Sequence, residues 1–431
     1  MVTKTANYDL SARNTFRMRV HCALYVEVTE EADLPDLDWD SLPQPVLVMG
    51  GGSNLLFTRD FPGTVLHVAA EGSIPGGHVH PRTWVGGGAR CDSSGRGRSE
   101  RSERSSSGDT SFYDVTIPAG AVFDEFCAWA AEEGLWGPEN LSLIPGEVGA
   151  SAVQNIGAYG VEAKDIIASI RAYDRSTGQF VTIDPATCAY GYRTSKFKTE
   201  WKGRYVITAV TYRLSRTPQP RLDYGGVRKA LEEMGVSMEA QTASASLRPL
   251  PTRNASDDAA VGPSRSGRDF PPIIPEGISA LVGHGHGWPW VCAPTLTPTL
   301  VREAIIGIRQ QKLPAVEELG SAGSFFCNPV ISREHFHRIE AIAQADNGPD
   351  YQVPHYEVGD SVKVPAAWMI EQCGFKGARN GGAQVYQKQP LVIVNASGTA
   401  FPEDIIGLEQ QIIKTIEQKY GITLHPEVEH V

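Results

Sequence analysis

Two glycine-rich segments carry the residue types that a phosphorylated or flat ligand requires. The first is Gly50-Gly51-Gly52-Ser53-Asn54, whose closely spaced backbone N–H groups can approach a pyrophosphate without side-chain obstruction. The second runs from residue 144 to residue 160 and combines glycines with amide side chains that could hydrogen-bond the edge of a ring. The first segment is not G-x-G-x-x-G, so a Rossmann site is disfavoured. Either segment could instead be a structural turn or crossover.

Three further residues could stabilise charge or donate a proton, although each has a simpler interpretation when taken alone. Arg193, in YGYRTSKFK, can stabilise negative charge without titrating, but most single arginines are surface cations. Ser324, in GSFFCN, can donate a proton, but it could equally be a chance serine in a strand. Glu427, in HPEV, needs a pKa raised by burial or negative charge to act as an acid, and otherwise it is a solvated charge in a frayed tail.

The elements that must position these residues are strands and helices mixed along the chain. The run PVLVMGGGSNLLF from Pro45 predicts a buried strand that the glycines stop, followed by a further short strand. The segment FYDVTIPAGAVFDEFCAWAAEEG predicts a strand, a glycine break and an amphipathic helix that contains Phe123 and Phe126 and is capped at Gly134. No steady βαβ rhythm is present, so an α+β fold of more than one domain is favoured.

The C-terminal part of the chain alternates helices with strands. An amphipathic helix is predicted from Leu300 until Pro314 ends it, and a second helix at 332–345. A strand is predicted at 390–395 and a final helix from Pro402 to Tyr420, ending at Gly421.

Two polar segments interrupt this pattern. Residues 91–111 (CDSSGRGRSERSERSSSGDTS) and residues 237–275 have too few apolar side chains to offset the entropy of ordering them, so both are expected to be disordered insertions. His284 and His286, in GHGHGWPW, have the alternate spacing of metal ligands, but no third ligand accompanies them. The sequence therefore predicts no metal site.

Composition restricts the classes of partner. The formal charge of -11 at pH 7 argues against a general nucleic-acid surface or an anionic membrane, since binders of either cluster Lys and Arg. The sequence shows no N-terminal apolar segment and no apolar run of about 18 residues, which favours a cytoplasmic protein. The seven cysteines are scattered and never spaced as C-x-x-C, which favours reduced thiols.

Five motifs together carry a resemblance to a known family. GGGSN, PGEVGASAVQNIGAYG, YGYRTSKFK, GSAGSFFCNP and the closing HPEVEHV occur in the same order as in UDP-N-acetylenolpyruvoylglucosamine reductases, and they resemble the longer of the family's two types. The resemblance covers nearly the whole chain outside the two polar segments. It implies an FAD- and NADPH-dependent enzyme that reduces UDP-N-acetylglucosamine enolpyruvate to UDP-N-acetylmuramate for peptidoglycan synthesis, in a loop-closed site from which water is excluded.

The resemblance also implies a domain organisation. It implies the FAD-binding fold shared with vanillyl-alcohol-oxidase-like flavoproteins, in two subdomains, plus an α+β substrate-binding domain. The expected boundaries are 1–60 together with the tail 421–431 for the first subdomain, 61–313 with both polar insertions for the second, and 314–420 for the substrate-binding domain. A monomer is expected, again by resemblance alone.

Roles for individual residues follow from the same resemblance. Arg193 and Glu427 are expected to stabilise an enolate-like intermediate, while Ser324 donates a proton to C2 after hydride reaches C3. The residues expected to bind FAD are Gly50, Gly51, Gly52, Ser53, Asn54, Pro145, Gly146, Gly149, Ala150, Ser151, Asn155, Gly157, Ala158 and Tyr159. Those expected to bind substrate are Tyr224, Lys312, Asn328, Lys376 and Gln389. Glu147 departs from the family pattern, and its charge is expected to point away from the pyrophosphate.

Two other functions remain open at this stage. An oxidase of the wider flavoprotein group would pass electrons to oxygen, although GGGSN lacks the histidine that often links the flavin covalently. A flavin-binding protein without catalysis would use the polar segments to bind partners. The intact set of Arg193, Ser324 and Glu427 favours the reductase.

Overall fold

The computed structural model describes residues 1–69, 111–237, 295–315 and 318–431. One compact unit consists of Met1–Met234 together with Thr297–Val431, and the intervening Gly235–Leu296 forms a separate unit described only at its ends. The predicted insertions at 91–111 and 237–275 lie almost entirely outside the described residues, as do His284 and His286. The fold that positions the site therefore belongs to the first unit.

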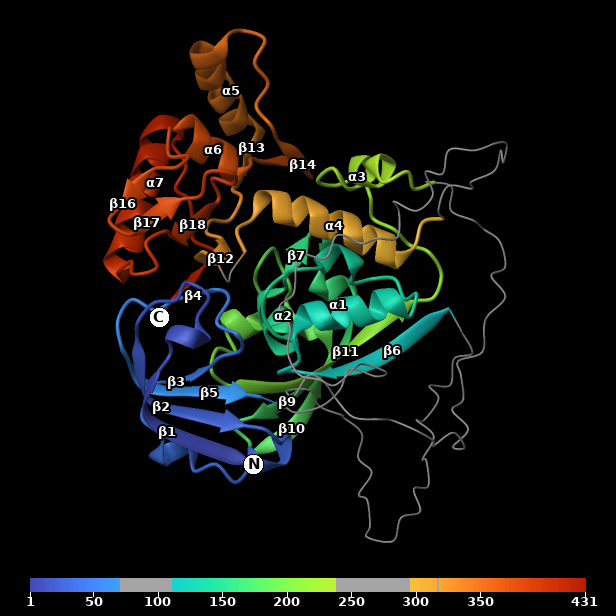
Figure 1. Ribbon diagram of the computed structural model, residues 1–431, viewed down its shortest axis with the longest axis vertical. Helices are drawn as coiled ribbons and strands as arrows, with labels where there is room; N and C mark the ends of the chain where they lie inside the picture. Colours follow the sequence, from blue (N-terminus) through green and yellow to red (C-terminus); the bar gives the residue numbers. More distant parts are fainter. Residues whose placement is uncertain (70–110, 238–294, 316–317) are drawn as a thin grey trace, which may run out of the picture. The chain divides into compact units, whose positions relative to one another are not determined.

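The N-terminal part of the first unit is a four-stranded sheet with the order β1-β2-β5-β3 (Figure 1, blue). Strand β1 is antiparallel to β2, whereas β2 and β3 both run parallel to β5. Most of β5 is buried, because it lies between two neighbours, and β1 carries polar residues at the exposed edge. The strands are β1 Val2–Asp9, β2 His21–Val28, β3 Val46–Val48 and β5 Phe61–Val68. The sheet extends beyond the boundary expected at residue 60.

A second sheet, antiparallel throughout, follows in the order β10-β9-β11-β6. Helices α1 and α2 pack against it (Figure 1), and the ring of Phe126 in α1 stacks on that of Tyr212 in β11 with centroids 4.5 Å apart. The predicted strand, glycine break and helix are confirmed here, with Gly134 in a left-handed conformation after α1. The elements are β6 Phe112–Pro118, α1 Phe123–Glu132, α2 Val148–Gln154, β9 Ile167–Asp174, β10 Gln179–Ile183 and β11 Tyr205–Ser215.

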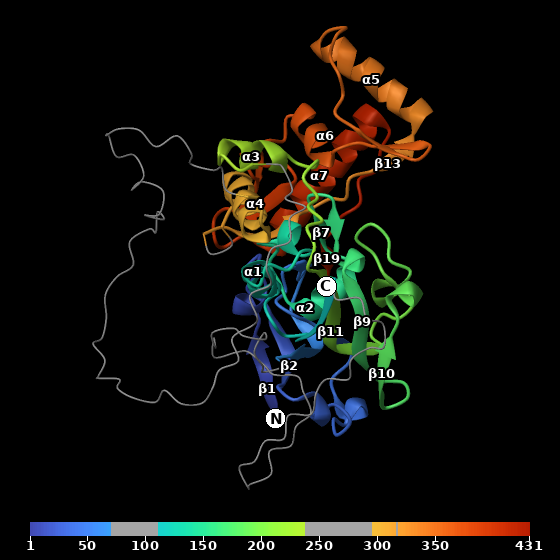
Figure 2. The ribbon, with the colours of Figure 1, turned by 90° about the vertical axis from the view of Figure 1, so that its right-hand side faces the viewer.

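One short hairpin and two helices complete the middle of the chain. Strands β7 and β8 form a small antiparallel pair directly after α2. The helix predicted between Leu300 and Pro314 is confirmed as α4, which packs on α1 and α3 (Figure 2). The elements are β7 Gly157–Ala158, β8 Val161–Glu162, α3 Val227–Glu233 and α4 Pro298–Lys312.

The C-terminal part contains a four-stranded antiparallel sheet, β12-β18-β17-β16, and a three-stranded one, β13-β15-β14. Helix α7 packs on the larger sheet and buries its apolar face there, and both predicted C-terminal helices and the predicted strand are confirmed. The elements are β12 Gly320–Ser324, β13 Val330–Ser332, α5 Arg333–Asn347, β14 Tyr356–Val358, β15 Ser361–Lys363, α6 Ala366–Gln372, β16 Arg379–Asn380, β17 Ala383–Val385, β18 Val392–Asn395 and α7 Pro402–Tyr420.

The segment after α7 returns to the N-terminal part of the chain. Gly421 ends the helix at φ +66°, as predicted, and β19 (Glu429–His430) then pairs in parallel with β4 (Leu55–Leu56). Strand β4 is the short strand predicted after the three glycines. This return brings Glu427 beside the glycine segment at 50–54, so the residue does not lie in a frayed tail.

The described elements mix helices with parallel and antiparallel sheets, so the predicted α+β class is confirmed. Within the described ranges, no helix is long and apolar enough to cross a membrane. The same residues contain no cluster of three or more His, Cys, Asp or Glu side chains arranged to hold a metal ion.

Candidate active site

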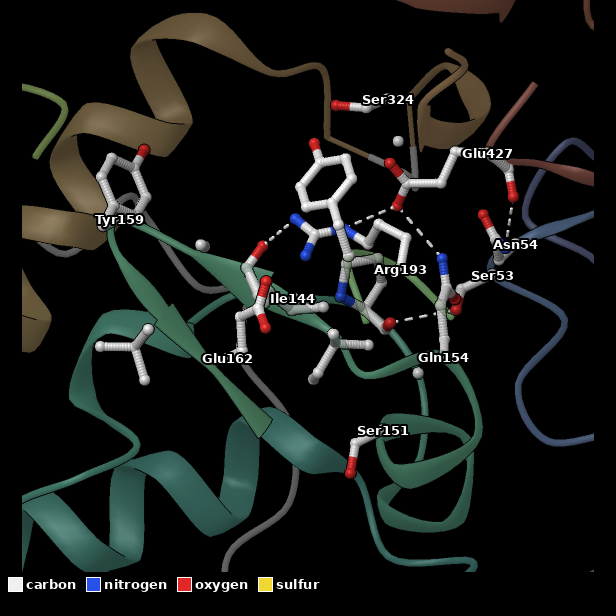
Figure 3. A pocket seen from close by; sticks show the side chains of 18 of the residues that line it. Ser53, Asn54, Ile144, Ser151, Gln154, Tyr159, Glu162, Arg193, Ser324 and Glu427 are labelled. Atoms are coloured by element: carbon white, nitrogen blue, oxygen red, sulfur yellow. Dashed lines mark hydrogen bonds and ion pairs between the residues drawn. The ribbon is translucent and has the colours of Figure 1, made fainter. Parts of the chain in front are cut away.

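The three residues expected to be catalytic line one pocket of about 510 Å³, together with parts of all three sheet regions (Figure 3). Arg193 follows the second sheet's β10, Ser324 ends β12, and Glu427 precedes β19. They are separated by more than a hundred residues along the chain, so only the fold can bring them together. The structure therefore places the three expected residues in a common cavity.

Arg193 and Glu427 form a mostly buried ion pair at the centre of this pocket. Arg193 Nε donates to Glu427 Oε1 at 3.0 Å, and Gln154 Nε2 donates to the same oxygen at 3.1 Å (Figure 3). Only 16% of the Arg193 side chain and 11% of the Glu427 side chain are exposed. A second guanidinium nitrogen of Arg193 donates to the carbonyl of Gly157. The cation is thus fixed on two sides and lines the pocket.

The backbone around Arg193 is held in an unusual conformation. Arg193 has φ +57°, a left-handed value that costs energy for a residue with a side chain. The turn is secured by Asn155, whose Nδ2 donates to the carbonyl of Gly191 at 2.8 Å, and by Ser195, whose hydroxyl donates to the carbonyl of Val153. Gly157 is needed beside it, because a Cβ there would lie 2.7 Å from a guanidinium nitrogen of Arg193.

Glu427 is positioned through its backbone by both neighbouring parts of the fold. Its N–H donates to the carbonyl of Phe325 at 2.8 Å, and its carbonyl accepts from Asn54 Nδ2 at 3.1 Å. Burial raises the pKa of the Glu427 carboxyl, while Arg193 acts in the opposite direction. A carboxyl with a raised pKa can exchange a proton closer to neutral pH than an ordinary glutamate can.

Ser324 lies on the same side of the pocket as Glu427 (Figure 3), at the residue where β12 ends. The neighbouring Phe325 is fully buried and its backbone N–H donates to the carbonyl of Leu391 at 2.7 Å, so the strand end is fixed. A hydroxyl held at the surface of a cavity beside an ion pair can donate a proton to a ligand there.

The glycine segment at 50–54 lies between this pocket and a second one of about 230 Å³. Gly52 has φ +62°, and a Cβ there would lie 2.1 Å from the carbonyl oxygen of Arg13, so no other residue fits without a backbone shift. Ser53 Oγ donates to the carbonyl of Pro145 at 3.0 Å, which ties the first glycine segment to the second. The second pocket is more apolar and includes Trp201 and Tyr205.

The second glycine segment differs from the expected ligand loop, because α2 occupies its centre. Gly149 packs so closely on Ala119 that a Cβ would lie 2.9 Å from the Ala119 Cβ, and its N–H donates to the Ala119 carbonyl. Asn155 is fully buried at the helix end and lines neither pocket. Its amide is used within the protein, with Glu162, Gly191 and the backbone N–H of Lys164 as partners. Asn155 therefore supports the Arg193 turn from behind.

The other residues expected to bind FAD divide between the two pockets. Glycines 50–52 and Gly149 line the second pocket only, whereas Ser53, Asn54 and Ala150 line both. The first pocket alone is lined by Pro145, Gly146, Ser151, Gly157, Ala158 and Tyr159. The two cavities thus share one wall.

Glu147, whose charge was expected to point away from the pyrophosphate, lies against the first glycine segment. A Cβ on Gly50 would lie 3.0 Å from Glu147 Oε2, and the carboxylate lines both pockets. His67 explains how the charge is tolerated, because its Nε2 lies 3.0 Å from Glu147 Oε1. The sequence offered no signal for this pairing, since His67 lies in β5 and Glu147 lies 80 residues later, directly before α2.

Comparison with known proteins places the chain in a family. A model of the C-terminal domain of UDP-N-acetylenolpyruvoylglucosamine reductases matches residues 314–431, and an FAD binding domain model matches residues 106–184. The UDP-N-acetylenolpyruvoylglucosamine reductase of Bacteroides fragilis (strain YCH46) is 35% identical over 427 residues, which cover 98% of this chain and 99% of that protein. The chain belongs to this reductase family. The reductase of Chromobacterium violaceum is 36% identical and covers 98% of this chain and 97% of its own length.

The fold agrees with that of a solved reductase structure. UDP-N-acetylenolpyruvylglucosamine reductase from Thermus caldophilus superposes with a TM-score of 0.55 at 17% identity, covering 100% of this chain and 98% of the other. The FAD-binding reductase fold expected from the motifs is therefore confirmed.

The residues expected to bind the reductase substrate are only partly gathered at the pocket. Tyr224 and Asn328 line it, and the Tyr224 ring stacks on Tyr356 with centroids 5.4 Å apart. Lys376 instead pairs with Glu371 at 2.7 Å, and Lys312 is exposed at the end of α4. Neither lysine lines the pocket, and neither does Gln389, whose side chain accepts from the N–H of Leu391.

Three other cations line the pocket and were missed by sequence reasoning: Lys164, which pairs with Glu162, together with Lys363 and Arg309. Lys363, at the end of β15, lies 4.9 Å from the ring centroid of Tyr192. Arg309, in α4, donates to the carbonyl of Leu143, while its buried Nε has no hydrogen-bond partner among the described residues. The sequence predicted the helix that contains Arg309, but a single cation in a helix gives no signal of what its side chain faces.

Proposed function

We propose that this protein reduces UDP-N-acetylglucosamine enolpyruvate to UDP-N-acetylmuramate, with NADPH as the electron donor and FAD as the resident cofactor. The observation that carries the proposal is the Arg193–Glu427 ion pair, which shares one pocket with Ser324 beside a glycine segment. Membership of the reductase family supports the same chemistry. The product would serve peptidoglycan precursor synthesis.

The residues of the two adjoining pockets fit a dinucleotide flavin. Backbone groups at Gly50 and Gly51 have room for a pyrophosphate, since both glycines line the second pocket. The unpartnered Nε of Arg309 is a buried donor that a ligand in the first pocket can satisfy. Trp201 and Tyr205 offer aromatic surface for an adenosine moiety in the second pocket. When bound, the flavin accepts hydride from NADPH and supplies it to the enolpyruvyl group.

The side chains of the first pocket supply charge stabilisation and a proton. Reduction of the enolpyruvyl double bond leaves negative charge beside the substrate carboxylate, and the fixed guanidinium of Arg193 stabilises that charge without titrating. Glu427, whose carboxyl has a raised pKa, hydrogen-bonds the part of the substrate on which that charge develops. Ser324 donates the proton to C2. Because Arg193 and Glu427 are already fixed, little reorganisation is required during the reaction.

The proposal also covers the division of the chain into domains, its location, its oligomeric state and its partners. The N-terminal sheet with the tail at 421–431 forms one subdomain, the region to residue 313 a second, and residues 314–420 the substrate-binding domain. The protein acts as a cytoplasmic monomer on small molecules, without nucleic acid or membrane partners. A net charge of -11 and the absence of a spanning helix among the described residues support this view.

The decisive experiment follows the two half-reactions. The purified protein is reduced anaerobically with NADPH, and UDP-N-acetylglucosamine enolpyruvate is then added while the flavin spectrum is recorded. We expect rapid reoxidation with formation of UDP-N-acetylmuramate, and ping-pong kinetics in the steady state. Reoxidation only by oxygen would indicate an oxidase, and a protein that binds no flavin would overturn the proposal.

A further inference from the structure

Behind the first glycine segment lies a buried polar network that the reaction does not use. Its centre is His67 on β5, of which 5% is exposed. His67 Nε2 lies 3.0 Å from Glu147 Oε1, and Nδ1 lies 3.0 Å from the Tyr25 hydroxyl and 3.4 Å from Glu27 Oε2. The imidazole therefore stands between two carboxylates that belong to different elements of the fold.

The other groups facing His67 neutralise only one of these carboxylates. Arg13 Nη2 pairs with Glu27 Oε2 at 3.1 Å, and its guanidinium lies over the Tyr25 ring at 5.5 Å. Burial raises the pKa of Tyr25, so its phenol stays protonated and adds no charge. With Arg13 assigned to Glu27, the imidazole is the only ion-pair partner that the described residues offer Glu147, although Lys198 and Lys202 line the same second pocket. The network carries a net negative charge whenever His67 is neutral.

The geometry allows His67 to gain a proton without breaking a hydrogen bond. In the neutral form, Nε2–H donates to Glu147 and the Tyr25 hydroxyl donates to Nδ1. In the charged form, Nδ1–H donates to the Tyr25 oxygen, and the hydroxyl turns toward Glu27 Oε2, which lies 3.4 Å away. Both protonation states are thus accommodated by the same heavy atoms.

The unbalanced carboxylate lies against the segment proposed to hold the pyrophosphate. A Cβ on Gly50 would lie 3.0 Å from Glu147 Oε2, and one on Gly51 would lie 3.9 Å from Glu147 Oε1. A diphosphate brought to these glycines meets a like charge at short range, in a site where only 15% of the Glu147 side chain is exposed. Protonation of His67 removes that repulsion.

We propose that the His67–Glu147 pair is a proton-binding site coupled to FAD, so that the protein takes up one proton from solvent, at His67 Nδ1, when FAD binds. The proposal rests on the FAD site of the proposed function. Linkage then requires FAD affinity to fall as pH rises through the range in which the empty site loses this proton. Glu147 is accordingly the residue that makes cofactor affinity depend on pH.

The test is calorimetric titration of the flavin-free full chain with FAD at one pH, in phosphate and in Tris. These buffers differ in ionisation enthalpy, so the difference between the two binding heats counts the protons taken up. We expect uptake approaching one proton per FAD for the wild type at a pH where the empty site is unprotonated. Titrations at several pH values between 6 and 9 locate that range.

Two variants test whether the proton is taken up by the His67–Glu147 pair. Glu147→Gln keeps an acceptor for His67 Nε2–H but removes the charge, so we expect tighter FAD binding and almost no proton uptake. Glu371→Gln removes a matched carboxylate from a surface ion pair and should behave as the wild type. Across the titrating range, the wild-type dissociation constant should rise by up to about tenfold per pH unit, and that of Glu147→Gln should stay constant.

The outcomes separate this inference from the proposed function. Equal binding heats in both buffers for the wild type across pH 6 to 9 would overturn it, and so would proton uptake by Glu147→Gln equal to that of the wild type. In either case FAD still binds and the reductase proposal stands. A wild-type chain that binds no FAD under any of these conditions would instead remove the reductase proposal, and this inference with it.

Discussion

The centre and the mouth of the first pocket are built in different ways. At the centre, Arg193 and Glu427 are mostly buried and connected by hydrogen bonds to three segments of the fold. At the mouth, Tyr192 and Tyr224 are more than a third exposed, and the Tyr224 ring stacks on that of Tyr356. Buried charges in fixed hydrogen bonds tolerate little change, whereas stacked rings at a surface can separate at small cost.

The chemical step and the exchange of substrate therefore depend on different parts of the pocket. Chemistry that develops charge needs groups already in place, and only the centre offers them. Admission and release of a large substrate need groups that move, and only the mouth offers those. Substitutions at the centre should therefore alter the chemical step, and those at the mouth should alter substrate affinity.

The largest effect is expected for Ser324→Ala. Removal of the proposed proton donor should slow reoxidation of the reduced flavin by substrate by roughly two orders of magnitude or more, the scale of lost general-acid catalysis. Flavin reduction by NADPH should stay nearly unchanged. Stopped-flow measurement of both half-reactions checks this, and equal slowing of the two would contradict the assignment.

Glu427→Gln should show the next largest effect and a change in pH dependence. Glutamine keeps acceptor and donor atoms for Arg193 and Gln154 but cannot ionise, so we expect a loss of about tenfold to a hundredfold in the same half-reaction. Because burial raises the pKa of Glu427, its protonated form persists to higher pH than in an ordinary glutamate, and the wild-type rate should fall as pH rises through that raised pKa.

The pH profile supplies the check on this prediction. The substrate half-reaction is measured between pH 5 and pH 9 for the wild type and the variant. The variant should lack the descending limb, and a limb of the same shape in both proteins would assign the titration to another group.

At the mouth, Lys363→Ala should raise the KM for the enolpyruvyl substrate by about tenfold, with a smaller change in kcat, because a cation that lines the pocket is lost to an anionic substrate. Lys376→Ala serves as the matched control, since Lys376 pairs with Glu371 away from the pocket. Steady-state kinetics distinguish the two, and a larger increase in KM for the Lys376 variant would restore the role first expected for that lysine.

The smallest effect on catalysis is expected for Glu139→Gln, behind the pocket wall. Burial raises the pKa of Glu139 to about 7 in the folded protein. The protonated carboxyl therefore contributes its full stability below the pKa that Glu139 has in the unfolded chain, and this stability is lost as pH rises through about 7. The variant should be more stable than the wild type at pH 8, by up to about 3 kcal/mol, and nearly equal to it at pH 4, below the ordinary pKa of a glutamate. Chemical denaturation at both pH values measures this, while kcat should not change.

The sequence predicted most elements and the three central residues but not all that surrounds them. Helices α1 and α7 have apolar residues at helical spacing and β3 is an apolar run that the glycines end, so the positions of these elements followed from local physics. Arg193, Ser324 and Glu427 were found because each lies in a motif, not because an isolated arginine, serine or glutamate is informative. Only the folded chain shows that these three side chains line one pocket.

What was missed depends on contacts between distant segments. Helix α2 resembles a loop in composition, and it forms because Gly149 can pack directly on Ala119. Lys363 and Arg309 carry no local pattern that separates them from solvated cations. The pairing of Glu147 with His67 joins the second sheet region to the first, so neither segment alone could predict where the carboxylate points.

The bond between Asn54 and Glu427 spans 373 residues of chain. Contacts this distant form late in folding, because the entropy of closing a long loop must be overcome before they contribute stability. The sheets and their helices can each be complete while the ion pair at the centre does not yet exist. A partly folded intermediate with near-native secondary structure would therefore be catalytically silent, and the appearance of activity would time the final step of folding.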